Sequence, residues 1–261
     1  MKIIACIKQV PDSEAKVRAE NGRVTWGDAP LVINPFDEYA VEGALQQKEA
    51  TDGASSSLST VTALCIGPES AREALKHALA MGADEAVLVS DPVLTDLDTV
   101  GAARVLAAAI QKLGADMVVC GRQTLDNGAG ITPAQTARVL GWPMLGLAGQ
   151  IKVQDGSATV ERVIEEGRQT VSAKLPAVVS VVQSIGEPRY PSFMGIRKAS
   201  KANIPIWSLA DLGIAAPQAV VKRMELMNPP VRETTVEIIS GESPAEIADR
   251  LADKILAEKV L

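Results

Sequence analysis

Residues 113–123 decide the fold and read LGADMVVCGRQ. This stretch begins where a helical pattern ends, stops that helix at Gly114, and continues into the apolar strand 117–120. Glycine adopts the left-handed conformation that ends helices at little cost. The same succession occurs at residues 81–84, which read MGAD and lead into the apolar run 86–90. Two helices that each stop at a glycine and feed a buried strand predict two successive crossovers of the same hand.

Apolar runs alternate with helix-period stretches through the first two thirds of the chain. We expect strands at 3–7, 60–66, 86–89 and 117–120, and helices at 37–49, 70–81, 98–113 and 133–140. Strands that are apolar throughout and alternate with helices form parallel sheets covered on both faces. The predicted fold class is therefore α/β, with a doubly wound, mostly parallel, Rossmann-like sheet.

Two hairpins interrupt this alternation. The dipeptide Asn21-Gly22, within residues 11–30, predicts a tight turn between two short strands. A second hairpin is expected within residues 150–172, around the turn at 154–157, and is followed by a buried strand at 177–180.

The pattern loosens after residue 186, where prolines stand at 188, 191, 205, 217, 229 and 230. We expect an α/β domain over residues 1–186, then an extended arm and a terminal helix over 187–261. Ser243 caps that helix in our reading, with Pro244 at its first position and Glu246 completing a capping box. Its apolar stripe at Ile247, Leu251 and Ile255 needs a surface to cover it.

Composition excludes several classes of function. The chain carries 26 basic and 32 acidic residues, a formal net charge of −6, so nucleic acid is not an expected partner. The longest apolar runs fall far short of the roughly 20 residues of a membrane-spanning helix. The first residues lack the longer apolar stretch of a secretory signal. We therefore expect a cytoplasmic protein without membrane insertion.

Cysteine and histidine usage argues against a metal site. Cys6, Cys65 and Cys120 lie in strand-like runs without a C-x-x-C pair, which makes a disulfide framework or a structural zinc site improbable. His77 is the only histidine, so a catalytic triad would have to be built around it. We expect it to be a partly exposed helix residue, and we expect no metal ligands.

The loop 121–132 follows a buried strand and ends where a helix begins. We expect Thr132 to cap that helix, Pro133 to take its first position, and Gln135 to complete a capping box. Free amides and the helix dipole at such a start form a phosphate site, which the Gly128 and Gly130 backbone can approach closely. The P-loop pattern is absent. The same spacing also fits an ordinary strand-to-helix loop.

Several segments together resemble the beta subunit of electron transfer flavoproteins. The matching segments are 7–12, 34–42, 78–84, 121–123 with Asp126, 141–143, 175–179 and 187–190. They run in family order over most of the chain. The resemblance implies an adenine-nucleotide alpha-hydrolase-like fold and a heterodimer in which the alpha subunit holds most of one FAD. The beta subunit would then bind AMP and help to cover the flavin, as an electron carrier rather than an enzyme.

By this resemblance, one set of residues would line the AMP pocket: Cys6, Asn34, Pro35, Phe36, Asp37, Ile66, Gly121, Arg122, Gln123, Thr124, Leu125, Asp126, Asn127, Gly128, Ala129, Gly130, Ile131 and Thr132. Ser13 and Phe36 would lie near the FAD. The family commonly has a second acidic residue and an Asn/Gln-Gln-Thr-Gly run after Asp126, whereas this chain reads NGAGITP at 127–133. The side-chain contacts of that loop therefore depart from the family pattern.

Some relatives split electron pairs between two acceptors and bind a second FAD in place of AMP. The turn 10–12, with Asp12, is similar to theirs, whereas segments 16–18 and 34–36 favour AMP. The sequence therefore leaves both AMP and a second FAD as candidate ligands.

Residues 189–201 contain four basic residues and no acidic one, in a chain that is net acidic. Apolar anchors ringed by positive charge suit an acidic partner surface. In the family this is the loop that docks on flavin dehydrogenases such as acyl-CoA dehydrogenases, with ETF:quinone oxidoreductase as the acceptor. The resemblance assigns docking to Arg189, Tyr190, Phe193, Met194, Ile196, Arg197 and Lys198. The alternative is that the apolar members are core residues beneath a solvated basic rim.

Two other classes share this kind of sheet. Adenylating ATP pyrophosphatases carry S-G-G-x-D-S after the first strand, where this chain reads KQVPDS at 8–13. Nucleotide-sensing proteins of the universal-stress type carry a G-x-x-G run ending in Gly-Ser, which the loop 121–132 lacks. Neither class is favoured.

Overall fold

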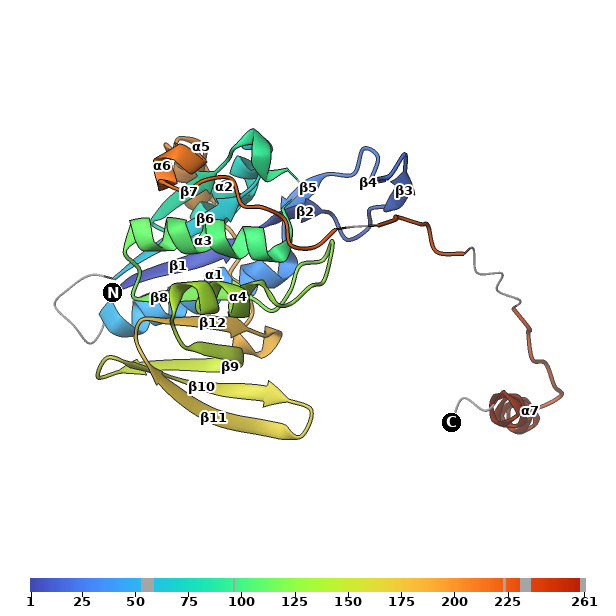
Figure 1. The fold of residues 1–261 in the computed structure, drawn as a ribbon. Coiled ribbons are helices and arrows are strands. Elements are labelled where there is room, and N and C mark those ends of the chain that lie inside the picture. Colours follow the sequence, from blue (N-terminus) through green and yellow to red (C-terminus); the bar gives the residue numbers. More distant parts are fainter. Residues whose placement is uncertain (53–58, 96, 223, 231–235, 259–261) are drawn as a thin grey trace. The chain divides into compact units, whose positions relative to one another are not determined.

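The computed structural model describes residues 1–52, 59–95, 97–222, 224–230 and 236–258. Contacts along the chain divide it into two compact units, Met1–Glu225 and Leu226–Leu261. The first contains the sheet and the second contains one helix, α7 (Figure 1). Each unit is described by itself.

A nine-stranded sheet runs through the first unit in the order β11-β10-β9-β12-β8-β1-β6-β7-β13. Its parallel strands are β1 (Lys2–Ile7), β6 (Thr60–Ile66), β7 (Glu85–Val89), β8 (Met117–Gly121), β9 (Met144–Gln154), β12 (Ala177–Val181) and β13 (Ile206–Trp207). The antiparallel strands β10 (Ser157–Ile164) and β11 (Gly167–Lys174) extend one edge. The predicted α/β class with a mostly parallel sheet is confirmed.

Helices cover both faces of this sheet. They are α1 (Pro35–Asp52), α2 (Arg72–Met81), α3 (Thr99–Leu113) and α4 (Thr132–Leu140), with short 3₁₀ turns at Glu69–Ala71, Pro92–Leu94 and Gln183–Ile185. Apolar residues of α1 and α2 belong to one core cluster, and those of α3 and α4 to another. Figure 1 shows α3 and α4 in front of the strands. The chain moves outward through β6 and β7, then returns to place β8 on the other side of β1. This reversal divides the helices between the two faces.

Glycine stops fix the ends of α2 and α3, as the repeated MGAD and LGAD segments predict. Gly82 and Gly114 both have positive φ, 131° and 70°. Asp98 begins α3 by accepting a hydrogen bond from the Gly101 amide at 2.7 Å. His77 lies on α2, with its Nε2 2.9 Å from a carboxylate oxygen of Glu38 on α1.

Both predicted hairpins are present. Strands β3 (Arg18–Glu20) and β4 (Arg23–Thr25) pair around Asn21-Gly22, whose φ values of 51° and 72° suit a tight turn. Their base is the pair β2 (Gln9–Pro11) and β5 (Leu31–Ile33). Strands β9 and β10 turn at Asp155-Gly156, again with both φ values positive.

The stretch from residue 187 to 225 is more ordered than the predicted irregular arm. It contains α5 (Phe193–Ser200), the edge strand β13 and the short helix α6 (Leu209–Leu212). Ser192 and Ser208 cap the two helices, and β13 pairs with β7. Helix α5 packs against α2, because Gly195 lies so close to the Ala80 carbonyl that a Cβ would collide with it. These elements belong to the first unit.

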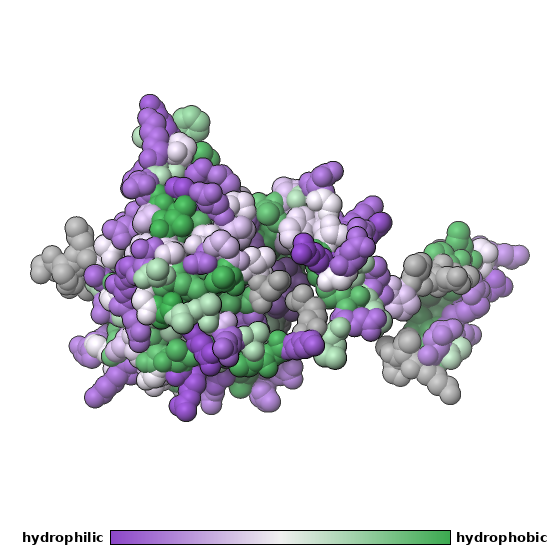
Figure 2. Space-filling view, turned by 45° about the horizontal axis from the view of Figure 1, so that its top comes forward, coloured by the Kyte–Doolittle hydropathy of each residue, from purple (hydrophilic) through white to green (hydrophobic). Residues whose placement is uncertain are grey.

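In the second unit, α7 spans Pro244–Ala257. Ser243 caps it as predicted, by accepting from the Glu246 amide. The predicted capping box is wrong in its second half, because the Glu246 carboxylate accepts from the Glu242 amide instead of the Ser243 amide. Leu251 and Leu256 are exposed on this helix, whose surface is both apolar and polar in Figure 2. Among the described residues, no helix is both long and apolar enough to cross a membrane.

Candidate nucleotide site

A cavity of about 700 Å³ opens at the carboxyl ends of β1, β6, β7 and β8. The strand order reverses between β1 and β8, and open α/β sheets bind their ligands beyond such a reversal. The predicted residues that line it are Cys6, Asp37, Ile66, Gly121, Arg122, Gln123, Thr124, Asn127, Ala129, Gly130 and Thr132. The structure thus brings most of the predicted set to one cavity.

The cavity also has a wall that the sequence did not indicate. It runs from the end of β7 to the start of α3 and includes Asp91, Leu97 and Asp98. The Asp98 carboxylate accepts hydrogen bonds from the amides of Val220 and Val221 as well as from Gly101. The only available signal was that Ser90 and Asp91 follow a buried strand, and the carboxyl ends of parallel strands meet at one edge.

Asn34 and its neighbours Pro35 and Phe36 lie behind the loop rather than on the cavity wall. The fully buried Asn34 amide donates to the Gln123 carbonyl oxygen at 2.9 Å, and its Oδ1 accepts from the Leu125 amide at 3.0 Å. One side chain from the start of α1 therefore fixes both sides of the loop bend. Leu125, Asp126, Gly128, Ile131 and Ser13 are likewise outside this cavity's lining.

Asn34→Ala should open the loop. It leaves the Gln123 carbonyl and the Leu125 amide without their partner, which costs about 1–3 kcal/mol for each buried polar group. We expect a loss of unfolding free energy of about that size, and weaker retention of any nucleotide that occupies the cavity. Urea unfolding and ligand release by denaturation measure the two effects. Asn127→Ala is the matched control for unfolding, because the Oδ1 atom of this exposed side chain accepts a local hydrogen bond from the Ala129 backbone amide. Equal losses in the two variants would contradict the expectation.

Asp37 is a buried carboxylate at the root of the loop. It accepts from the Lys8 amide at 2.8 Å. Burial raises its pKa to about 7, against the opposing effect of hydrogen bonds from Asn34, Lys8 and Gly121. Gly121 passes so close that a Cβ there would lie 2.6 Å from the Phe36 carbonyl oxygen. Only glycine fits at this crossing of β8 and α1.

The floor of the cavity contains two thiols on neighbouring strands. Cys6 and Cys120 are paired in register on β1 and β8, and both are buried. A hydrogen bond with Cys120, together with burial, holds the pKa of Cys6 well above its usual range. A thiol that stays protonated is a poor nucleophile. Cys6 is therefore part of an apolar floor rather than a reactive group.

The predicted start of α4 is wrong by one residue. The helix begins at Thr132, so Ile131 is the N-cap and Pro133 the second helical residue. No side chain caps the helix, and the Gln135 Oε1 atom is buried without a hydrogen-bond partner in the described part of the chain. Gly128 and Gly130 take positive φ values of 61° and 65°. The first backbone N–H groups of α4 therefore have no side-chain cap among the described residues, which is the arrangement that phosphate sites use.

The predicted docking residues are displayed on and just before α5. Tyr190, Phe193 and Met194 are 89%, 82% and 70% exposed, and Ile196 is also exposed. The alternative reading, in which they are core residues, does not hold. Arg197 and Lys198 lie in the last turn of the same helix. The result is an apolar patch beside positive charge.

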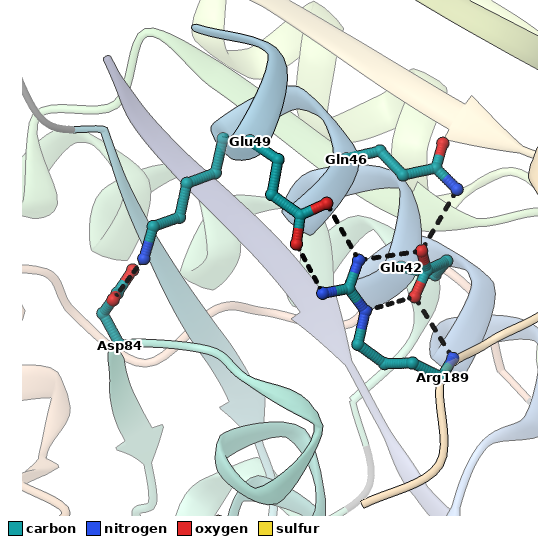
Figure 3. A network of polar contacts seen from close by, with 6 residues as sticks. Glu42, Gln46, Glu49, Asp84 and Arg189 are labelled. Atoms are coloured by element: carbon teal, nitrogen blue, oxygen red, sulfur yellow. Dashed lines mark hydrogen bonds and ion pairs between the residues drawn. The ribbon is translucent and has the colours of Figure 1, made fainter. Parts of the chain in front are cut away.

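The guanidinium group of Arg189 forms ion pairs with two glutamates of the same chain (Figure 3). Its Nε and Nη2 donate to Glu42 at 2.8 and 3.0 Å, and its Nη1 donates to Glu49 at 2.6 Å. Gln46 adds a bond to Glu42 at 3.1 Å. Burial acts to raise the pKa of Glu42, but the hydrogen bonds from Arg189 outweigh it and lower that pKa. The cluster anchors the segment before α5 to α1.

Comparisons with known proteins agree with this geometry. Residues 27–212 match the electron transfer flavoprotein domain family. The chain is 33% identical to the electron transfer flavoprotein subunit beta of Megasphaera elsdenii over the whole of both chains, and 36% identical to that of Mycobacterium leprae over 99% of each. It is also 33% identical, over the whole of both chains, to the caffeyl-CoA reductase-Etf complex subunit CarD of Acetobacterium woodii. The chain therefore belongs to the electron transfer flavoprotein family, as a beta subunit that serves electron transfer.

Proposed function

We propose that this chain binds AMP in the cavity at the ends of β1, β6, β7 and β8, and helps to cover an FAD held mainly by an alpha subunit. The observation that carries the proposal is the fixed loop 121–132, which leaves the start of α4 uncapped beside that cavity. A nucleotide phosphate suits such a helix start. Arg122 lines the cavity and supplies positive charge there.

The residues present fit an adenine nucleotide. Gly130 on the cavity wall admits close approach, and the cavity combines an apolar floor with carboxylates that can accept hydrogen bonds from a ribose or an adenine amino group. Ser13 and Phe36, near the first hairpin and the start of α1, would face the flavin. When bound, the flavin supplies the redox chemistry. This chain's own residues position the nucleotide and exclude water, and we propose that it is an electron carrier rather than an enzyme.

A second FAD in place of AMP is the competing proposal. Two observations favour it: the likeness to a subunit of a caffeyl-CoA reductase-Etf complex, and the size of the cavity. Pockets of about 300–1,000 Å³ hold ligands up to drug size, so a cavity of about 700 Å³ admits more than a mononucleotide. In that case the complex would pass electrons to two acceptors.

The partner subunit would be held by the C-terminal part of the chain. We propose that residues 187–261 dock on other proteins, with the unburied apolar stripe of α7 lying on the alpha subunit. The patch at Phe193 would meet flavin dehydrogenases such as acyl-CoA dehydrogenases. ETF:quinone oxidoreductase would be the electron acceptor. We propose that this chain acts in the cytoplasm.

Co-expression with a candidate alpha subunit tests the assignment. We expect a yellow heterodimer. Its ligands are then released by denaturation, and the FAD and AMP per heterodimer are counted. One FAD with one AMP supports the first proposal, and two FAD without AMP support the second. A colourless protein that hydrolyses ATP would overturn both.

Phe193→Ala should slow electron exchange with the dehydrogenase while leaving flavin content unchanged. Phe193 is 82% exposed, so the change removes a docking anchor and little packing. Truncating a central interface anchor costs about 2 kcal/mol or more of binding free energy. We therefore expect electron transfer to be at least roughly tenfold slower when the partner concentration is limiting. Stopped-flow reduction of the flavin measures it. Val139→Ala, at another exposed apolar position on α4, should leave the rate unchanged. An unaltered rate in Phe193→Ala would remove this patch from the docking surface.

A further inference from the structure

A second cavity, of about 710 Å³, lies on the other side of the loop that walls the first. Four residues line both cavities: Arg122, Gln123, Ala129 and Gly130. Most of the remaining lining comes from β9, β10, β11 and β12, and includes Gly146, Leu147, Arg162, Ser172 and Ser180. Nothing described so far in the nucleotide site accounts for this cavity.

The charge lining this cavity is one-sided. Two arginines line it, and the lining contains no aspartate or glutamate. The whole chain has a net charge of −6, so an acid-free cavity with two guanidinium groups runs against the overall balance. Guanidinium groups recognise phosphate and carboxylate through paired donors.

Arg162 is held in place by neutral partners. Its Nε donates to the Gly146 carbonyl oxygen at 3.0 Å, and its Nη1 donates to Gln169 at 3.0 Å. Neither partner carries a negative charge, so the cation is oriented without being neutralised. By contrast, Arg168 on β11 is paired with Glu161.

The opposite wall shows a backbone that departs from regular strand geometry. Leu147 has a φ of 59°, in the left-handed region, and its amide donates to the buried Ser180 hydroxyl at 3.2 Å. A leucine in this conformation is uncommon, and such conformations gather at binding sites. The register of β9 also shifts twice nearby, against β12 between Leu145 and Ala148 and against β10 between Ala148 and Gln150. These irregularities lie on the strand that pairs with Arg162, whose register partner is Ala148.

We propose that this second cavity is an anion site that takes a phosphate group, with Arg162 as its fixed cation and Arg122 shared with the first cavity. Its phosphate has two conceivable sources: a separate phosphate-bearing ligand, or the far end of a long ligand that is seated in the first cavity and reaches past the loop. The site stands on Arg162 and its surroundings, and does not require AMP in the first cavity.

Inorganic pyrophosphate is the probe. The full chain, with any subunit that copurifies, is titrated calorimetrically at saturating AMP, and then again at saturating FAD. We expect one equivalent of pyrophosphate to bind in the presence of AMP, with an affinity that falls as salt is raised. Binding that persists with FAD indicates a separate ligand. Binding that only FAD abolishes indicates the far end of a long ligand.

Arg162→Gln should weaken pyrophosphate binding at least tenfold, and Arg162→Lys less. Arg168→Gln is the matched control, because Arg168 lies on the neighbouring strand outside both cavities, and it should bind like the wild type. Absence of pyrophosphate binding by the wild type, or an equal loss in Arg168→Gln, would overturn the proposal.

A second measurement avoids dependence on variant folding. Phenylglyoxal modifies arginine side chains, and mass spectrometry locates the modified positions in the wild type. Pyrophosphate should protect Arg162 and leave the exposed Arg197 reactive. Equal modification of Arg162 with and without pyrophosphate would count against the site, whatever the variants do.

Discussion

The Asp37 carboxyl should make the free energy of unfolding fall as the pH rises from about 4 to about 7. Its ordinary pKa is 3.8, and burial raises the pKa in the folded protein to about 7. Between these values the folded state holds one proton more than the unfolded state, so stability declines as the pH rises. At about 1.4 kcal/mol per pH unit, the total approaches about 4 kcal/mol. Above pH 7 both states are ionised and this contribution is constant.

Asp37→Asn should remove this dependence while keeping an oxygen for the Lys8 amide. Urea unfolding of both proteins at intervals from pH 4.5 to 8 gives the difference curve, which cancels groups common to the two. The free energy of unfolding of the wild type minus that of Asp37→Asn should fall between pH 4.5 and about 7 and stay constant at higher pH. Asp155→Asn, in the exposed turn between β9 and β10, is the control, and the Asp37→Asn difference should be the steeper of the two. A flat difference for Asp37→Asn would refute the assignment.

Arg189→Ala should destabilise the first unit by about 2–3 kcal/mol. Removing one partner of a buried ion pair typically costs about 3–5 kcal/mol, and the lower figure here allows for solvent at the arginine. The Glu42 side chain is 7% exposed and that of Arg189 is 34% exposed. Glu42 would lose the guanidinium and keep two neutral donors, the Gln46 side chain and the backbone amide of residue 189. Thermal and urea unfolding measure the loss.

Arg168→Ala is the matched control, because its ion pair with Glu161 lies on the surface, where such pairs contribute at most about 1 kcal/mol. The Arg189 effect should also shrink in acid. The lowered pKa of Glu42 stabilises the fold above its ordinary value of 4.5, and that contribution is lost as the pH falls. A loss in Arg189→Ala no larger than the control's would show that the cluster is not an anchor.

Local patterns in the sequence were sufficient for the framework of the fold. The strand predicted at 60–66 has those bounds in the structure, because a run of buried residues is bounded by polar and glycine residues. Asn21-Gly22 and Asp155-Gly156 turn where predicted, since few other residue pairs accept two positive φ values. The loop 121–132 was found because a glycine-rich segment follows a buried strand.

Contacts between distant segments were beyond such reasoning. Nothing near Arg189 in the sequence indicates Glu42, which lies on another helix, so a residue that holds the chain together was assigned to partner docking alone. The wall at Asp91 and Asp98 depends on which strands become neighbours. Helix α5 has only eight residues, and prolines and basic residues around it resemble an irregular loop. The predicted start of α4 was one residue too late because a threonine before a proline fits two arrangements. The threonine can be the N-cap with proline first in the helix, or it can itself be the first helical residue, as it is here.

The two hydrogen bonds between Asn34 and the loop connect it to residues that lie 89 and 91 positions further along the chain. Such distant pairings form late, because a long stretch of chain must be ordered before they gain anything. Strands β1, β6, β7 and β8 must therefore already stand side by side before the loop acquires its shape. Any ligand that needs this loop could therefore bind only after the sheet has formed.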